Sequence, residues 1–176
     1  MELNENLLQK IATHVAIFKG MPRQCLINTL NCSDNWPVKK GEPFFKEGDK
    51  GQSFFIILGG QVSVEKLING QQVELAVLKA GDCFGEMALV DGKARSATVR
   101  AVADTISLRF SREKLEAYPE AGAHVYRNIS KILVSRLAES NTATAQLKTQ
   151  VAELTAKAGQ KDVAQEGPAK QVVVRK

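Results

Sequence analysis

The chain has 176 residues, of which 24 are basic and 19 acidic, so its formal net charge is +5. Its hydrophobic fraction of 44% and charged fraction of 24% match ordinary globular proteins and argue against collagen-like or wholly disordered classes. The N-terminal sequence lacks the basic flank of a signal peptide, and no apolar run is long enough to span a membrane. We therefore expect a soluble, cytoplasmic protein without a membrane partner, built from one well-buried domain and helical additions.

Much of the positive charge lies in the C-terminal segment 157–176, where basic residues are spread among small and polar ones. This pattern is typical of a solvated tail. We expect weak nonspecific affinity for polyanions from the charge and no specific nucleic-acid partner.

Reactive side chains are sparse. Three cysteines, Cys25, Cys32 and Cys83, form no CxxC pair and have no histidine cluster nearby, so we interpret them as small buried hydrophobes. We predict neither a disulfide framework nor a metal site, and no cofactor. The two histidines, His14 and His124, lie outside the motif described below and offer no nucleophile–base pair, so we predict that the protein is not an enzyme.

Two short helices are predicted at the N-terminus. Apolar residues between Asn6 and Phe18 recur at intervals of three and four, which places them on one face of a helix. A second helix is expected over residues 22–30, with Pro22 near its first position. Residues 1–30 are thus predicted to be the N-terminal helices of the domain.

The middle of the chain predicts β-structure. Glycines interrupt short runs of β-branched and aromatic residues, and Asn69-Gly70 is a strong hairpin signal. The predicted strands are SFFIIL, QVSVEKL, VELAVLK, SATVRAV and TISLRF. The expected fold class is α+β: an antiparallel β-roll, jelly-roll-like, over residues 31–118, flanked by the N-terminal helices and a long C-terminal helix. A metal-holding cupin, the alternative barrel, would need a histidine-rich cluster on its strands.

A short helix capped by Ser111 and a long helix over residues 119–157 are expected next, followed by a flexible tail over 158–176. Two sets of positions in the long helix are spaced by seven and alternate at intervals of four and three, as in a two-stranded coiled coil. They are Leu133, Ser140, Leu147 and Leu154, and Leu137, Thr144, Val151 and Ala158. Because Ser140, Thr144 and Ala158 are poor seam residues, two interpretations stay open: a homodimer through this helix, or a single amphipathic helix that frays towards its end.

The segment FGEMALVDGKARSATVR, from Phe84 to Arg100, carries the chemistry. Gly85 precedes one helical turn, where free backbone N–H groups would converge on an anion. Arg95 could grip a phosphate with two nitrogens, whereas Glu86 would repel it and suits a neutral sugar hydroxyl. A phosphate and a sugar together indicate a nucleotide. The alternative is a surface ion pair between Glu86 and Arg95, which would contribute little stability.

At this point the sequence resembles a family. FGEMAL followed by RSATVRA is similar to the phosphate-binding cassette of cyclic nucleotide-binding domains, which occur in catabolite activator proteins, kinase regulatory subunits and cyclic-nucleotide-gated channels. VKKGEPFFKEGDKGQSFFIILGGQVSV and AGDCFGE agree with this resemblance, which extends from about Leu7 to Leu137. The matching cassette residues are Gly85, Glu86, Ala88, Leu89, Arg95 and Ala97.

The resemblance implies a role for each matching residue. Glu86 would hold the ribose 2′-hydroxyl, and Arg95 the equatorial oxygen of the cyclic phosphate. The backbone amides of Met87, Ala88 and Ala97 would bind its other oxygens.

Further residues are implied for the rest of the ligand. Ser96 is similar to the serine or threonine that reaches phosphate or base, although it also suits a purely local bond to the backbone. Val64 and Leu75 match positions that pack against the purine. Ser140 and Asn141 match the hydroxyl pair that meets adenine N6 in bacterial activators, with the alternative that they are ordinary polar residues of a helix surface.

The resemblance implies a stand-alone cyclic nucleotide receptor that acts in signal transduction by allosteric regulation. No helix-turn-helix pattern follows Asn141, so the expected output is a change in the long helix that signals to an unidentified effector protein or to a second copy. Cyclic AMP is the favoured ligand, and cyclic GMP stays possible because Ser96 also suits guanine. The alternative is a nucleotide-independent dimeric scaffold that retains the fold.

Overall fold

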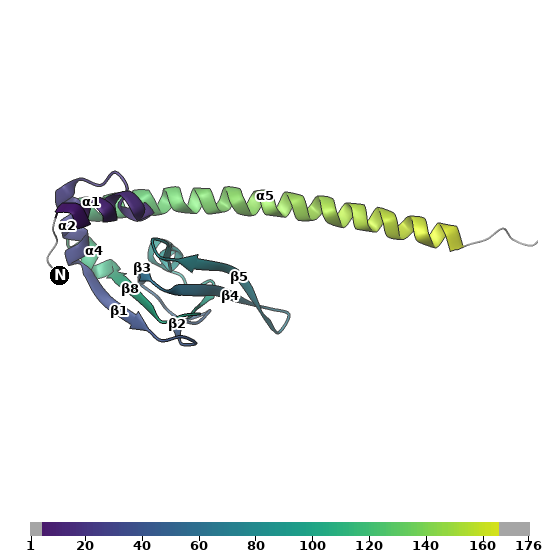
Figure 1. Cartoon of the computed structure of the whole chain (residues 1–176), viewed down its shortest axis with the longest axis horizontal. Helices are drawn as coiled ribbons and strands as arrows, with labels where there is room; N and C mark the ends of the chain where they lie inside the picture. Colours follow the sequence, from purple (N-terminus) through teal and green to yellow (C-terminus); the bar gives the residue numbers. More distant parts are fainter. Residues whose placement is uncertain (1–4, 166–176) are drawn as a thin grey trace, which may run out of the picture. The chain divides into compact units, whose positions relative to one another are not determined.

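Two four-stranded antiparallel sheets form the β-roll of the computed structural model, which describes residues 5–165 (Figure 1). One sheet has the order β1-β8-β3-β6 and the other β2-β7-β4-β5. The strands are β1 Ser33–Val38, β2 Pro43–Phe45, β3 Ser53–Gly59, β4 Gln61–Ile68, β5 Gln71–Lys79, β6 Cys83–Phe84, β7 Thr98–Ala101 and β8 Thr105–Ser111.

The helices lie before, within and after these strands. The first are α1 Glu5–His14, a 3-10 helix η1 Ala16–Phe18 and α2 Arg23–Asn31; α3 Glu86–Asp91 lies between β6 and β7; α4 Arg112–Glu116 and α5 Pro119–Gln165 follow β8. Figure 1 shows α1, α2 and α4 gathered at one end of the β-roll. This arrangement confirms the predicted fold class of an antiparallel β-roll with N-terminal helices and a long C-terminal helix.

The core between the sheets is rich in aromatic residues. Phe55 and Phe84 stack with ring centroids 5.2 Å apart on one sheet, and Val62 and Val99 face them from the other. Strand β3 is buried on both faces, since Phe54 on its other side stacks on Phe110. This double burial explains why its sequence is a continuous apolar run rather than an alternating one.

Local sequence signals set the turns and caps. Asn69 and Gly70 both have positive φ, 52° and 80°, which is the backbone of the tight turn expected between β4 and β5. The Ser111 side chain accepts a hydrogen bond from the Lys114 amide, which confirms it as the N-cap of α4. Cys25, Cys32 and Cys83 are buried, as predicted.

The chain divides into two compact units, Met1–Ile132 and Leu133–Lys176. In the first unit, the start of α5 is bound to the N-terminal helices by a buried side-chain amide. Asn128 is 2% exposed and its Nδ2 donates to the carbonyl oxygens of Ile17 (2.8 Å) and Lys19 (3.0 Å). Ala121, Val125 and Ile129 are buried on the same stretch of helix.

The second unit contains the remainder of α5, whose large apolar side chains are exposed. Leu137, Leu147 and Val151 are each 61% exposed, and Leu154 is 66% exposed. The helix ends at Gln165 rather than at Lys157, so residues 158–165, expected in a flexible tail, are helical. The reason is that this stretch has no proline, and Gly159 alone costs only about 1 kcal/mol. The rest of the predicted tail, 166–176, lies outside the described residues.

We expect Asn128→Ala to lower the free energy of unfolding by about 2–4 kcal/mol, because it removes two hydrogen bonds and leaves the buried carbonyl of Ile17 without a donor. Urea denaturation followed by circular dichroism measures this change. Ser130→Ala is the matched control, since its exposed hydroxyl bonds only to Tyr126 O of the same helix. Equal losses for the two variants would contradict the role given to Asn128.

Candidate functional site

The cassette starts from a backbone conformation that favours glycine. Gly85 has φ +79°, ends the short strand β6 and begins α3 as predicted. Gly92, with φ +69°, ends the helix one residue after Asp91. Glu86, the first residue of α3, is 3% exposed, so its carboxylate lies in the protein interior. The predicted short helix in this segment is confirmed.

Arg95 follows α3 and its backbone is fixed by the β2–β3 loop. Its N–H donates to the carbonyl oxygen of Asp49 (2.9 Å), and its own carbonyl accepts from the Gly48 N–H (2.9 Å). Its side chain is buried, with the guanidinium carbon 4.0 Å from the centre of the Phe45 ring. Its Nη1 donates to the carbonyl oxygen of Gly85 (2.7 Å). The guanidinium is therefore held directly against the start of the cassette.

Two glycines leave the space that this guanidinium fills. A Cβ on Gly51 would lie 2.2 Å from Arg95 Nε, and a Cβ on Gly85 would lie 2.8 Å from Arg95 Nη1. Neither approach is possible without a shift. A larger residue at either position would thus displace the cation of the cassette.

The electrostatics of Arg95 suit an anion. Burial lowers the pKa of Arg95, while the charges of Asp49 and Glu86 act in the opposite direction. Within residues 5–165, its buried Nε has no hydrogen-bond partner. Arg109 and Arg112 also have such an Nε but are only partly buried and lie outside the cassette. A buried cation with a free donor is stabilised by an anion that brings both charge and acceptor atoms.

The other cassette residues differ in exposure. Ala88 and Ala97 are buried, whereas Ser96 and Met87 are exposed and in contact, with Ser96 Oγ 3.6 Å from the Met87 sulfur. Lys66 of β4 donates to the carbonyl oxygen of Ser96 (3.0 Å). The structure therefore brings the loop after α3 and the start of α3 together.

The residues predicted to meet the base are placed separately. Val64 of β4 is half-buried, pairs with Val99 of β7 and packs on the core, whereas Leu75 is 53% exposed at an irregularity in the β4–β5 ladder. Ser140 and Asn141 are exposed residues of α5 in the second unit. Contact of any of these four residues with a base stays a prediction.

Sequence reasoning assigned no role at Arg95 to Phe45 and Gly51, which lie against its guanidinium, or to Gly48 and Asp49, which bond to its backbone. These four residues lie on one loop and its flanking strand, and the two glycines served in the sequence analysis as turn signals and as part of the family resemblance. Nothing in the spacing of these glycines shows that the loop meets Arg95. That information comes from the pairing of β2 with β7, the strand that Arg95 precedes.

Comparison with known proteins places the domain in a family. Residues 36–120 match the family described as the cyclic nucleotide-binding domain. The cyclic AMP receptor protein of Thermus thermophilus is 37% identical over 126 residues, which cover 71% of this chain and 58% of that protein. Residues 36–120 therefore belong to the cyclic nucleotide-binding domain family.

A solved structure and a second relative extend the comparison of the domain. The crystal structure of the Thermus thermophilus catabolite activator protein has a TM-score of 0.69 and 31% identity, covering 76% of this chain and 63% of that one. The cGMP-dependent protein kinase egl-4 of Caenorhabditis elegans is 32% identical over 103 residues, covering 57% of this chain and 13% of the kinase. This chain thus spans only part of these relatives.

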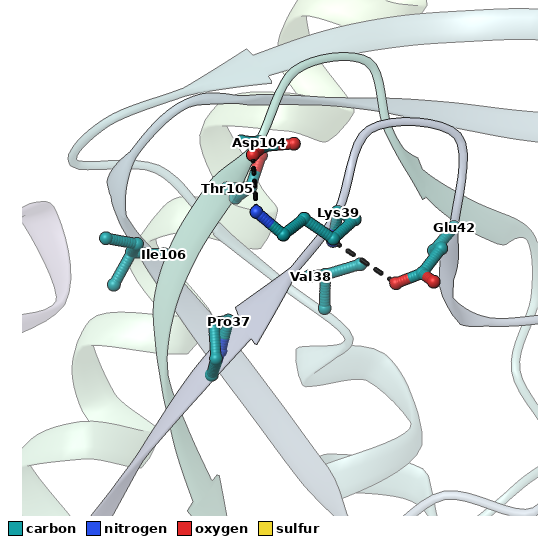
Figure 2. A pocket seen from close by; sticks show the side chains of 7 residues that line it. All are labelled: Pro37, Val38, Lys39, Glu42, Asp104, Thr105 and Ile106. Carbon is teal, nitrogen blue, oxygen red and sulfur yellow. Dashed lines mark hydrogen bonds and ion pairs between the residues drawn. The ribbon is translucent and has the colours of Figure 1, made fainter.

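The first unit also has a surface pocket away from the cassette. A surface pocket between β1 and β8 and their loops, shown in Figure 2, is lined by Pro37, Val38, Lys39, Glu42, Asp104, Thr105 and Ile106, none of which is a predicted site residue. Its charged groups already bind each other, since Lys39 Nζ lies 2.8 Å from Asp104 Oδ2.

Among the described residues, no helix is both long and apolar enough to cross a membrane.

We expect Gly85→Ala to lower the free energy of unfolding by about 1–3 kcal/mol, because it combines an unfavourable φ with crowding against the Phe45 ring (3.2 Å) and the Ser53 carbonyl oxygen (3.3 Å). Gly70→Ala is the matched control: its φ is +80°, but nothing lies within 4 Å of the added Cβ. Urea denaturation of both variants separates backbone strain from crowding. A Gly85 variant no less stable than the Gly70 variant would show that the cassette tolerates a side chain there.

Proposed function

We propose that this chain is a receptor for a cyclic nucleotide, with Arg95 as the group that binds the cyclic phosphate. The observation that carries the proposal is the buried guanidinium of Arg95, whose Nε lacks a partner in the part of the chain that is described and whose pKa is lowered by burial. Membership of the cyclic nucleotide-binding family supports the same ligand class.

The remaining cassette groups complete the proposed contacts. Glu86, buried beside the cation, accepts from the ribose 2′-hydroxyl, and the amides of Met87, Ala88 and Ala97 bind the phosphate oxygens. The exposed hydroxyl of Ser96 lies next to Met87 and contributes a further donor. Arg95 thus binds the negatively charged phosphate, and the Glu86 carboxylate binds the neutral ribose hydroxyl.

Cyclic AMP is the first candidate and cyclic GMP the second. Support for cyclic AMP comes from the Thermus thermophilus relative, a cyclic AMP receptor protein. Support for cyclic GMP comes from the cGMP-dependent kinase and from the hydroxyl of Ser96. On the base side we propose Val64 and Leu75 from the β4–β5 hairpin and Ser140 and Asn141 from α5.

For the signal, we propose that ligand binding changes the position of the cassette helix and thereby the C-terminal helix, which signals to an effector protein. A physical link supports this route: the guanidinium of Arg112 in α4 donates to the carbonyl oxygen of Leu89 in α3. Helix α4 leads directly into α5, and Asn128 joins α5 to the N-terminal helices. A coupling of about 1–3 kcal/mol is typical of such switches.

We also propose that α5 pairs with α5 of a second copy. Leu147, Val151 and Leu154 are exposed along one face at coiled-coil spacing, which a parallel partner helix would cover. Burying such side chains would offset the cost of ordering two long helices.

Calorimetric titration with cyclic AMP and cyclic GMP tests the receptor directly. Arg95→Lys is expected to weaken binding by at least about tenfold, because an ammonium group cannot copy the planar two-point contact. Arg109→Lys is the matched control, since Arg109 also stacks on an aromatic ring, Trp36, but lies outside the cassette. Equal affinity of Arg95→Lys and the unaltered chain would place the phosphate elsewhere.

Gly51→Ala provides an independent prediction. The new Cβ would displace the Arg95 guanidinium, so we expect nucleotide affinity to fall severalfold while stability changes little, because the displaced group is the end of a long side chain. Gly59→Ala is the control, with nothing within 4 Å of the added Cβ. If neither nucleotide raises the Tm of the unaltered chain, the scaffold alternative is favoured.

Leu147→Glu combined with Val151→Glu is expected to convert the protein to a monomer, because four acidic groups would then meet in the seam of the pair. Analytical ultracentrifugation measures the molecular mass. Thr149→Glu is the control because this exposed residue lies off the seam. An unaltered chain that sediments as a monomer contradicts pairing through α5.

A further inference from the structure

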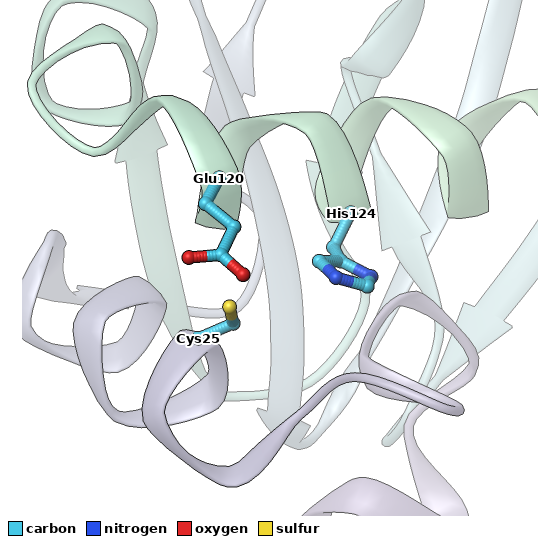
Figure 3. Close-up of side chains that lie close together, drawn as sticks. All are labelled: Cys25, Glu120 and His124. Carbon is cyan, nitrogen blue, oxygen red and sulfur yellow. The ribbon is translucent and has the colours of Figure 1, made fainter.

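We propose that Cys25, Glu120 and His124 form a binding site for a divalent transition metal ion of the zinc class. This site lies outside the cassette and does not depend on nucleotide binding. Figure 3 shows Glu120 and His124 on the first turns of α5, with both side chains on the face towards Cys25 of α2.

The three side chains offer one ligand atom each within a small volume. A thiol sulfur, a carboxylate oxygen and an imidazole nitrogen all lie within 4.8 Å of one another. Around a tetrahedral zinc ion, with bonds of about 2.0–2.3 Å, ligand atoms are about 3.5 Å apart. The cluster therefore needs to contract by about 1 Å, which rotation of the exposed Glu120 and half-buried His124 can supply.

The backbone that carries these ligands is fixed. Glu120 and His124 are four residues apart on a helix and so share one face. Ala121 and Val125, beside them, are buried, and Asn128 one turn further binds the N-terminal segment. Cys25 is itself buried at 3% exposure. The site thus rests on two helices of the same unit.

The donor set selects the kind of ion. Thiolate and imidazole are ligands for zinc and similar ions, whereas calcium and magnesium require oxygen. Without a metal, burial and the neighbouring Glu120 raise the pKa of the Cys25 thiol. A bound cation reverses this effect and the thiol gives up its proton to solvent as the metal–sulfur bond forms. Three protein ligands leave the fourth position for water.

One neighbour competes with the metal. Arg127 Nη2 lies 2.9 Å from His124 Nδ1. Because a guanidinium only donates hydrogen bonds, Nδ1 is the acceptor. A metal at Nδ1 would use the nitrogen lone pair that now accepts from Arg127. A metal at Nε2 would displace the ring proton from that nitrogen, and the neutral ring would then carry its proton on Nδ1. Metal binding at either nitrogen therefore breaks the bond to Arg127. Removing Arg127 should strengthen metal binding.

Cobalt titration of the full chain in reducing, chelator-free buffer tests the site, because Co²⁺ occupies zinc sites and a cobalt–thiolate bond absorbs in the near ultraviolet. We expect this absorption to saturate at one ion per chain and to be displaced by Zn²⁺. Cys25→Ser should abolish it. His124→Ala and Glu120→Gln, which alter less buried positions, should each weaken binding by at least about tenfold. Arg127→Ala should tighten it by about twofold to tenfold.

The chain provides matched controls. Cys32→Ser removes another buried free thiol, and His14→Ala removes the other histidine. Both variants should bind cobalt as the unaltered chain does. Absence of cobalt–thiolate absorption at millimolar Co²⁺, its persistence in Cys25→Ser, or undiminished affinity in His124→Ala would overturn the proposal. Calorimetry with cyclic nucleotide on the same His124→Ala sample should be unchanged, which separates this site from the cassette.

Discussion

The cassette depends on a positive charge that the fold buries beside the start of α3. Arg95 is 6% exposed, stacked on Phe45 and held by the carbonyl of Gly85. Desolvation of a guanidinium is unfavourable, and the nearby acids Asp49 and Glu86 offset it only in part, since the net effect lowers the pKa of Arg95. A protein that keeps such a group gains stability when an anion arrives, so structure and ligand affinity are linked at this residue.

The rest of the first unit positions this charge. Strand β2 pairs with β7 and brings the loop containing Gly48 and Gly51 against the residue that precedes β7. Burial of β3 on both faces fixes the sheet beneath the cassette. From the far end of α3, the bond between Leu89 and Arg112 leads to α4 and the start of α5. The cassette is thus part of a continuous packed structure that also includes the N-terminal helices.

Local signals made most of the fold predictable, and long-range pairing accounts for the remainder. The Asn69-Gly70 turn, the Ser111 cap and the β3 run follow from residues close in sequence. Strand β1 was missed because SDNWPV is polar and contains Pro37, yet it pairs with β8 over its whole length. In the site, the motif identified Glu86 and Arg95, but the contacts of Gly51 and the meeting of Cys25 with α5 arise only from tertiary structure. Such contacts join residues far apart in sequence, so no local pattern encodes them.

A crystal structure of the chain with cyclic AMP tests the central claim most directly. We predict that an equatorial phosphate oxygen lies within hydrogen-bond distance of Arg95 Nε or Nη2, and that the ribose hydroxyl contacts Glu86. Density for the nucleotide at another site, with Arg95 still bound only to Gly85, would contradict it.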